Sequence, residues 1–380
     1  MPRARLFDII RAGLPAFAYF YTVGAVGFWL PLFAEGLGMS YTGIQLLATV
    51  YFLFITPSTL LAGLAADITG RPDLVLAAGM LANGVSTALM PHMTETHELL
   101  ALRALQGLSL ATSIPVALGS LSLTLGVVRG VTATLMFSGT GMIAGSIVGG
   151  YLLEWYGFAP IFYSAAAISV ASALLALGWR PEAVIRRENI VEALRRLPAP
   201  VAVVVGALIL RNFFASGVFA TMSILFSEIK GLNPVETGLA LAVNPAFQVT
   251  LSLVLGSLVL GRELYLYSLG LAATGLVFQL YLNAAGLGGI LLAQAVLGTF
   301  YAMVMVSGNI FIINNAPSEI RYTASSLYGF AFNLGWVLGT PVAGVFMDRY
   351  SLEAWVALAS FGCLAAGLLA LVAKKAEKRA

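Results

Sequence analysis

Two stretches of the sequence, GSIVGGYLLEWY at residues 145–156 and GTPVAGVFMDRY at residues 339–350, repeat one pattern at a separation of 194 residues. Two glycines, a valine, an acidic residue and a tyrosine recur in register at that separation. Two further pairs of segments repeat at similar separations: EGLGMSYTGI (35–44) with KGLNPVETGL (230–239), and LLALRALQG (99–107) with ILLAQAVLG (290–298). A repeat of this length inside an apolar chain indicates a tandem duplication, the organisation of many membrane transporters.

The composition indicates an all-α integral membrane protein. Of the 380 residues, 59% are hydrophobic and 10% are charged, and the mean hydropathy of +0.93 leaves too little polar surface for a water-soluble globule. A helix needs about 20 apolar residues to cross a bilayer. Twelve stretches meet this need: residues 13–34, 42–65, 74–91, 99–122, 131–153, 158–179, 201–227, 235–258, 264–283, 287–313, 322–347 and 353–373.

One long polar insertion, residues 180–200, divides six of these spans from the other six. We therefore expect an N-terminal six-helix bundle over residues 1–179, a cytoplasmic linker over residues 180–200 and a C-terminal six-helix bundle over residues 201–380. A short helix that rests on the membrane surface and a plain solvated linker both fit the insertion.

The basic residues predict the orientation, because Lys and Arg in short loops stay on the cytoplasmic side. With the N-terminus inside, 16 of the 20 Lys and Arg residues face the cytoplasm, and only Lys230 and Arg349 face outward. We therefore expect a multi-pass protein of the plasma membrane with both termini cytoplasmic. The net charge of +3 describes a basic rim beside the membrane lipids, and we expect no nucleic-acid partner.

Three motifs follow one another along the first half of the chain. The turn after the second span reads GLAADITGRPD (63–73), the fourth span contains RALQG (103–107), and the fifth span contains G-x-x-x-G-S-x-x-G-G (141–150). In this order the motifs resemble those of the major facilitator superfamily, and the pattern is closest to that of its 12-helix drug/proton antiporters. The second half keeps a degraded turn signature, LGSLVLGRE (255–263), which lacks the aspartate.

The resemblance covers nearly the whole chain and implies two pseudo-symmetric six-helix bundles. The turn motif implies a conformational latch in which Asp67 pairs with Arg71 or meets a helix N-terminus; a solvated ion pair is the alternative. The motif residues of this latch are Gly63, Asp67, Gly70 and Arg71. Close helix packing is expected at Gly141, Gly145, Gly149, Gly150, Gly339 and Gly344. The chain departs from the family at Ile68 and Pro72, where a basic residue is usual, and at Ser146, where a proline is usual.

Two arginines lie within the spans, whereas all 17 acidic residues fall in loops or at span ends. Arg211 lies about 15 Å into its span, close to the middle of the membrane. An intramembrane arginine is a functional-site hypothesis that needs a partner. We expect a substrate site formed with amides and a tyrosine at similar depth: Arg211, Asn212, Tyr21, Asn244, Gln248 and Asn333. The alternative is that Arg211 bonds to backbone carbonyls and that the amides hold helices together.

The second intramembrane arginine, Arg103, is a candidate for proton coupling or for the lining of the cavity. It shares the RALQG motif with Gln106, and its counterpart in the repeat is Gln294. Glu35, at the outer end of the first span, is the nearest candidate proton carrier. A solvated charge at a helix end is the alternative for Glu35.

The sequence therefore predicts a secondary active transporter that moves a small organic solute by alternating access, with efflux like that of drug/proton antiporters. An organic or inorganic anion carrier that uses Arg211 is the alternative within transport, and a non-transporting membrane sensor is an alternative of another class. We expect no enzyme and no metal or cofactor, because the only histidines, His92 and His97, lie on one outer loop and no phosphate-binding loop is present. The expected partners are a small-molecule substrate, protons or another coupling ion, and lipids, with the chain a monomer.

Overall fold

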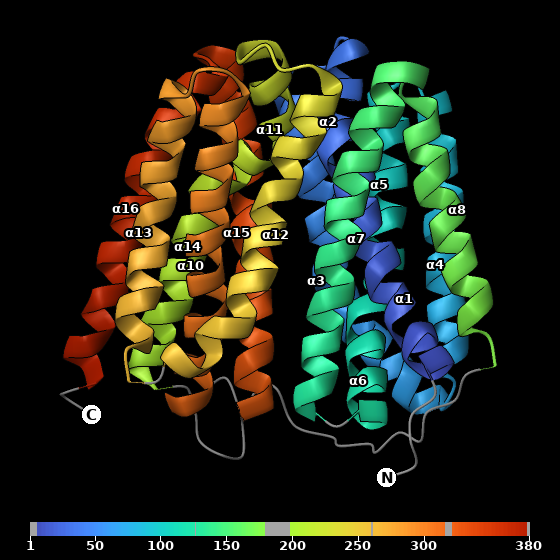
Figure 1. Cartoon of the computed structure of the whole chain (residues 1–380), viewed down its shortest axis with the longest axis horizontal. Coiled ribbons are helices and arrows are strands. Elements are labelled where there is room, and N and C mark those ends of the chain that lie inside the picture. Colours follow the sequence, from blue (N-terminus) through green and yellow to red (C-terminus); the bar gives the residue numbers. More distant parts are fainter. Residues whose placement is uncertain (1–5, 126, 179–197, 260, 316–320, 378–380) are drawn as a thin grey trace. The chain divides into compact units, whose positions relative to one another are not determined.

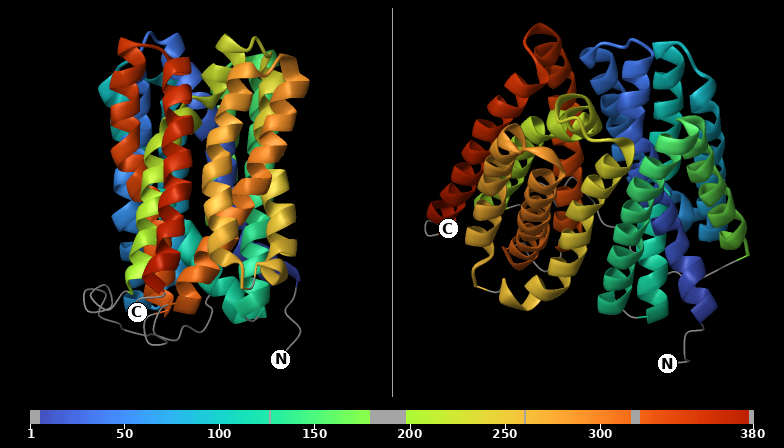
Figure 2. Two further views of the ribbon diagram at one scale, coloured as in Figure 1. Left: turned by 90° about the vertical axis from the view of Figure 1, so that its left-hand side faces the viewer. Right: turned by 45° about the horizontal axis from the view of Figure 1, so that its top comes forward.

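The protein is described by a computed structural model that covers residues 6–125, 127–178, 198–259, 261–315 and 321–377. These residues form helices joined by short turns, with no strand among them (Figure 1). The two turned views in Figure 2 show the same all-helical ribbon. The predicted all-α fold is therefore confirmed. The predicted linker lies almost entirely outside the described residues.

The chain divides into two compact units. The first contains Met1–Ile185 and Thr221–Pro245, and the second contains Arg186–Ala220 and Ala246–Ala380. One long helix passes from the first unit into the second, so this division differs from the boundary expected at residue 201. The predicted domain boundaries stay a prediction.

The helices of the first unit follow the predicted spans. Most begin or end at recognisable signals: the Ser40 side chain accepts a hydrogen bond from the Gly43 amide, and Gly70 ends a helix in the left-handed region at φ +59°. The elements are α1 (Leu6–Thr22), η1 (Val23–Gly27), α2 (Phe28–Gly36), α3 (Tyr41–Thr69), α4 (Pro72–Leu89), η2 (Met90–His92), α5 (Thr96–Leu110), α6 (Ser113–Leu125), α7 (Val127–Tyr156) and α8 (Ala159–Ala176).

The remaining helices follow the second half of the repeat. Two short elements, α11 (Met222–Ile224) and η3 (Leu225–Ile229), belong to the first unit. Helix α12 (Pro234–Leu258) divides between the units at Pro245. The second unit otherwise consists of α10 (Ala199–Ala220), α13 (Glu263–Asn283), α14 (Gly286–Asn315), α15 (Arg321–Arg349) and α16 (Leu352–Glu377).

Eleven helical stretches of the described chain are long and apolar enough to cross a membrane, one fewer than the twelve predicted. The difference lies at the expected span 99–122, which is broken into α5 and α6 at residues 111–112. Pro115 follows the break and has no N–H to donate to the carbonyl of Ala111, four residues earlier, so a continuous helix would lose that bond. The predicted count of twelve is therefore not confirmed.

The two units repeat one packing arrangement. Helix α7 packs against α1, and the counterpart helix α15 packs against α10. A Cβ atom on Gly145 would lie 2.3 Å from the carbonyl oxygen of Tyr21, and one on Gly339 would lie 2.0 Å from that of Phe213. Only glycine permits such close approach of two backbones. The duplication seen in the sequence is thus repeated in the crossing of these helices.

The first helix of each repeat is interrupted within its span. The π-helical turn η1 separates α1 from α2. At the repeat separation of the neighbouring segments, Val26 corresponds to Thr221, which adopts φ −120° and ψ 20° between α10 and α11. Irregular turns inside membrane helices often accompany binding sites, because they free backbone groups and redirect side chains. Arg211 lies in the helix that ends at this second interruption.

Candidate functional site

The Arg211 guanidinium lies wholly inside the second unit. Its side chain is fully buried on α10. Nη1 donates to Oδ1 of Asn212 at 2.7 Å, and Nη2 donates to Oγ1 of Thr274 on α13 at 3.3 Å. Nε is buried and has no hydrogen-bond partner. An arginine has five N–H donors, so this side chain keeps unused donors in a fully buried setting.

Two aromatic rings lie against the same guanidinium. Its Cζ atom is 5.1 Å from the ring centroid of Phe219 and 5.1 Å from that of Tyr301. Phe219 in turn stacks on Trp336, with centroids 6.2 Å apart. The faces of aromatic rings carry partial negative charge and attract cations. The rings therefore stabilise the guanidinium without neutralising its charge.

No ion pair of Arg211 occurs among the side chains that the structure describes. A buried charge without a counter-ion is costly, and an anionic ligand would offset that cost. Binding of an anionic substrate by Arg211 stays a prediction.

Neighbouring groups fix the two hydrogen-bond acceptors in place. The Asn212 amide donates from Nδ2 to the carbonyl oxygen of Phe332 at 3.1 Å, which directs its Oδ1 toward the guanidinium. The Thr274 hydroxyl donates to the carbonyl oxygen of Gly270 at 3.0 Å, which leaves its lone pairs for Arg211. The guanidinium is thus held in one orientation by groups that are themselves held.

The predicted substrate site is brought together only in part. Asn212 contacts Arg211, whereas Gln248 and Asn333 lie in the same unit but are not its hydrogen-bond partners. Tyr21 and Asn244 belong to the first unit, where the Tyr21 hydroxyl donates to Oγ of Ser164 at 3.1 Å. Convergence of the six residues stays a prediction.

The sequence analysis missed Thr274, Phe219 and Tyr301, the other groups around Arg211. Phe219 lies on α10, eight residues after Arg211, where an aromatic residue is ordinary for an apolar helix. Nothing in the spacing of Thr274 on α13 or Tyr301 on α14 connects them to Arg211. Only the packing of the helices identifies them.

The second intramembrane arginine, Arg103 on α5, is held more completely. It is 7% exposed, donates from Nε to the carbonyl oxygen of Leu47 at 3.3 Å, and donates from Nη1 to Oε1 of Gln106. Its Cζ atom lies 4.2 Å from the ring centroid of Tyr51, whose hydroxyl donates to that of Tyr19 at 3.3 Å.

This polar cluster extends across three further helices. Gln106 donates to the Thr87 hydroxyl at 3.1 Å, and Thr87 donates to Oδ1 of Asn83 at 3.4 Å. Asn83 donates to Oγ of Ser169 at 2.7 Å and to the Thr22 hydroxyl at 3.3 Å. The chain of bonds joins α5, α4, α8 and α1. The environment of Arg103 therefore resembles a structural network more than an open receptor.

The other two residues of the predicted coupling set are Gln294 and Glu35. Gln294, the counterpart of Arg103 in the repeat, is buried on α14 of the second unit. Glu35 lies near the end of α2 in the first unit and is partly exposed. A role in coupling stays a prediction for all four residues of the set.

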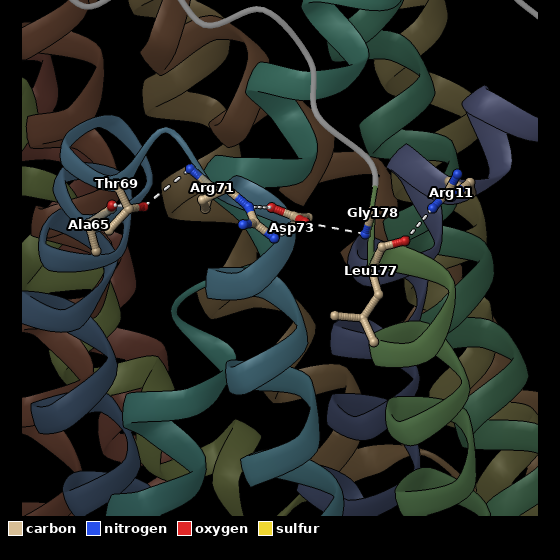
Figure 3. Close-up of polar contacts among 7 residues, drawn as sticks. All are labelled: Arg11, Ala65, Thr69, Arg71, Asp73, Leu177 and Gly178. Atoms are coloured by element: carbon tan, nitrogen blue, oxygen red, sulfur yellow. Dashed lines mark hydrogen bonds and ion pairs between the residues drawn. The ribbon is translucent and has the colours of Figure 1, made fainter.

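A third cluster lies where α4 begins and α8 ends (Figure 3). Arg71 donates to Asp73 through Nε at 3.0 Å and Nη2 at 3.1 Å, and this bond raises the pKa of the Arg71 guanidinium. Asp73 is fully buried and also accepts a hydrogen bond from the Gly178 amide at 3.2 Å. Arg11 donates to the carbonyl oxygens of Leu175 and Leu177 at 2.7 and 2.5 Å.

This cluster gives Arg71 a partner that the sequence analysis did not name. Asp73 is the described partner of Arg71; Gly63 and Asp67 lie in α3, but the side chain of Asp67 is not among those that the structure describes. The predicted latch through Asp67 stays a prediction. The sequence did hold a signal for Asp73: it follows Pro72 in the first turn of α4, and the first turn of a helix favours negative charge.

The predicted packing glycines lie at close helix contacts. A Cβ atom on Gly141 would lie 2.3 Å from the Phe17 carbonyl oxygen, one on Gly149 would lie 2.3 Å from the Trp29 indole nitrogen, and one on Gly150 would lie 2.5 Å from the Pro234 carbonyl oxygen. Gly344 is buried on α15. None of these glycines contributes a polar side chain to a site.

Comparison with known proteins gives the family. The family model described as Major Facilitator Superfamily matches residues 13–227 and again residues 204–380. The chain is 24% identical to the tetracenomycin C resistance and export protein of Streptomyces glaucescens, over 83% of this chain and 71% of that protein. It is also 24% identical to the 4-hydroxybenzoate transporter PcaK of Pseudomonas putida, over 86% of this chain and 81% of that protein.

Solved structures share the fold. A crystal structure of the nucleoside transporter NupG matches with a TM-score of 0.82 at 13% identity, and covers 97% of this chain and 99% of that one. A bacterial homologue of the human lysosomal transporter Spinster, in an inward-facing and occupied conformation, matches with a TM-score of 0.82 at 12% identity, over 99% and 98% of the two chains. The relatives and the family are transporters and not enzymes. The chain therefore belongs to the Major Facilitator Superfamily and is a multi-pass membrane transporter of the secondary type.

Proposed function

We propose that this transporter exports a small organic solute in exchange for protons and that Arg211 binds an anionic group of the solute. The observation that carries the proposal is the fully buried Arg211 side chain, whose Nε has no hydrogen-bond partner. Such a group is expensive to keep in a membrane protein unless a ligand uses it. Helices of the two repeats would alternately open the site to each side of the membrane.

Export is supported by the relative named as a resistance and export protein, which aligns with most of this chain. The relative named as a 4-hydroxybenzoate transporter supports an organic solute that carries an acidic group. The apolar and aromatic surroundings of Arg211 suit a solute with an apolar body.

Proton exchange requires a group that binds and releases protons. We propose Glu35 for this role, because it is a partly exposed carboxylate near the end of α2. Arg103 would then stabilise the helices of the first unit through the Gln106, Thr87 and Asn83 network and would not carry protons.

The test uses the purified chain in proteoliposomes with an imposed pH gradient and labelled 4-hydroxybenzoate. A proton-coupled exchanger accumulates the solute when the vesicle interior is acidic. A permeant weak acid that merely leaks across the bilayer accumulates when the interior is alkaline. We expect the solute to accumulate in acidic vesicles. This accumulation should disappear when nigericin collapses the gradient, and it should not occur in protein-free vesicles.

A second function, uptake of an organic anion together with protons, is favoured by the PcaK relative and by the same Arg211 site. It predicts accumulation in alkaline vesicles above the level in protein-free vesicles. The sign of the effective gradient therefore separates export by exchange from uptake by cotransport. Flux that is the same in both gradients, or no flux of any solute, would contradict proton-coupled transport.

A further inference from the structure

We infer that the ligand of Arg211 is a monocarboxylate attached to an aromatic ring and that the carboxylate binds the side of the guanidinium formed by Nε and Nη2. The inference rests on the proposed function and names its substrate class. It follows from which N–H groups are used, which rings lie nearby and which charges the second unit places around them.

Three of the five N–H groups of Arg211 make no hydrogen bond. Nη1 bonds Asn212 and Nη2 bonds Thr274, so the unused N–H groups are the one on Nε, one on Nη1 and one on Nη2. Nε and Nη2 form one side of a guanidinium, where their N–H groups are parallel. That pair of donors matches the two oxygens of a carboxylate, which accepts two parallel hydrogen bonds from one side of a guanidinium. A ligand with one neutral acceptor would leave one of the two donors unpaired.

The charge around the site matches a single negative charge. Arg211 is the one buried cation among the described side chains of the second unit, since Arg262 and Arg349 are exposed at helix ends. A monocarboxylate neutralises one guanidinium. A phosphate or phosphonate dianion would bring a second charge into a buried setting with no second cation to pair with it.

The rings around the guanidinium favour an aromatic body. Tyr301 packs edge-to-face on Phe332 with centroids 6.4 Å apart, and Phe219 packs edge-to-face on Phe278 with centroids 5.8 Å apart. A planar aromatic acid places its ring within this cluster while its carboxylate lies in the plane of the guanidinium. Aromatic pairs in such arrangements are favourable beyond the area that they bury.

The site is closed in this structure, because Arg211 is fully buried. Access for the carboxylate therefore requires movement of α10, α13 or α14, the helices that supply Arg211, Thr274 and Tyr301. A ligand-bound state and a closed state are both required by alternating access.

Equilibrium binding of labelled 4-hydroxybenzoate to the full chain in detergent tests the inference without any need for transport. Four unlabelled competitors separate its parts: benzoate, neutral benzamide, non-aromatic cyclohexanecarboxylate and dianionic phenylphosphonate at pH 8. We expect benzoate to compete best, and benzamide and phenylphosphonate to be about 10- to 100-fold weaker, the loss expected when hydrogen bonds to a charged group fail. Cyclohexanecarboxylate should compete less well than benzoate but better than benzamide and phenylphosphonate.

Two variants locate the site. Arg211→Lys keeps the charge but removes the two parallel N–H groups of Nε and Nη2, and we expect it to weaken binding about 10- to 100-fold. Thr274→Val removes the hydroxyl that accepts a hydrogen bond from Nη2, and we expect it to weaken binding less. Arg262→Lys, at an exposed arginine, is the matched control. Folding of each variant is checked by thermal melting.

Equal competition by benzamide, equal affinity of a folded Arg211→Lys variant, or no saturable binding of any aromatic carboxylate would overturn the inference. If carboxylates do not bind but a pH gradient still drives flux of another solute, only this inference fails and proton-coupled transport stands. If no solute moves in either gradient while benzoate binds at Arg211, the proposed function fails and the site assignment stands.

Discussion

The close approach of α15 to α10 gives a sharp prediction at Gly339. A Cβ atom there would lie 2.0 Å from the Phe213 carbonyl oxygen, and ordinary contact begins at 3.4 Å, so Gly339→Ala must push the two helices apart by roughly 1.4 Å. Overpacking of this kind costs about 1–3 kcal/mol. We therefore expect the melting temperature of Gly339→Ala to fall by a few degrees.

A matched control lies on the same helix. A Cβ atom on Gly329 would meet nothing within 4 Å, so Gly329→Ala keeps the gain in helix propensity of about 1 kcal/mol without any clash. The difference between the two variants therefore isolates the helix contact. Gly145→Ala, whose Cβ would lie 2.3 Å from the Tyr21 carbonyl oxygen, tests the same contact in the first unit.

The chain contains its own reporter for this measurement. Cys363 is the single cysteine and is fully buried in the second unit. A fluorogenic maleimide in detergent will label it only as the helices unfold, so labelling against temperature gives the melting curve. A Gly339→Ala variant that melts at or above the wild-type temperature, or a Gly329→Ala variant that falls equally far, would refute the packing argument.

Three other changes test separate parts of the structure. Asp73→Asn removes the carboxylate that accepts hydrogen bonds from Arg71 and the Gly178 amide. We expect this variant to have a lower melting temperature than wild type, whereas the control Asp8→Asn should not. Equal melting temperatures of the two variants would contradict a stabilising role of the cluster. Thr87→Val breaks the bonds to Gln106 and Asn83 and should cost about 1–3 kcal/mol, whereas exposed Thr140→Val should leave melting unchanged. Glu35→Gln should abolish accumulation driven by a pH gradient while solute exchange without a gradient persists; gradient-driven accumulation at the wild-type rate would exclude Glu35 as the proton carrier.

The helical architecture was predictable because it follows from local patterns. Apolar runs of span length predicted the helices, and glycines at matching positions of the repeat, such as Gly145 and Gly339, indicated that both halves pack alike. The break between α5 and α6 was harder to predict, because the apolar pattern continues across it and only Pro115 marks it. Hydropathy reports burial in the membrane and says little about the continuity of the backbone.

The candidate site was predictable only at its charged centre. Arg211 stands out in a sequence because a charge in a membrane span is rare, and adjacent Asn212 is its partner. Thr274 and Tyr301 come from helices 63 and 90 residues further along the chain, and their types are ordinary for membrane helices. Asp73 was harder to predict than Asp67, because the turn motif of the family contains the position of Asp67 and not that of Asp73, which lies at the start of α4.

Counterflow measures the central claim most directly, because it needs neither a pH gradient nor a coupling ion. Proteoliposomes are loaded with unlabelled 4-hydroxybenzoate and diluted into a trace of the labelled compound. The account predicts a transient accumulation of label in wild-type vesicles, with little or none in vesicles that contain a folded Arg211→Lys variant. Equal accumulation by the two proteins would contradict an Arg211 site that binds the solute during alternating access.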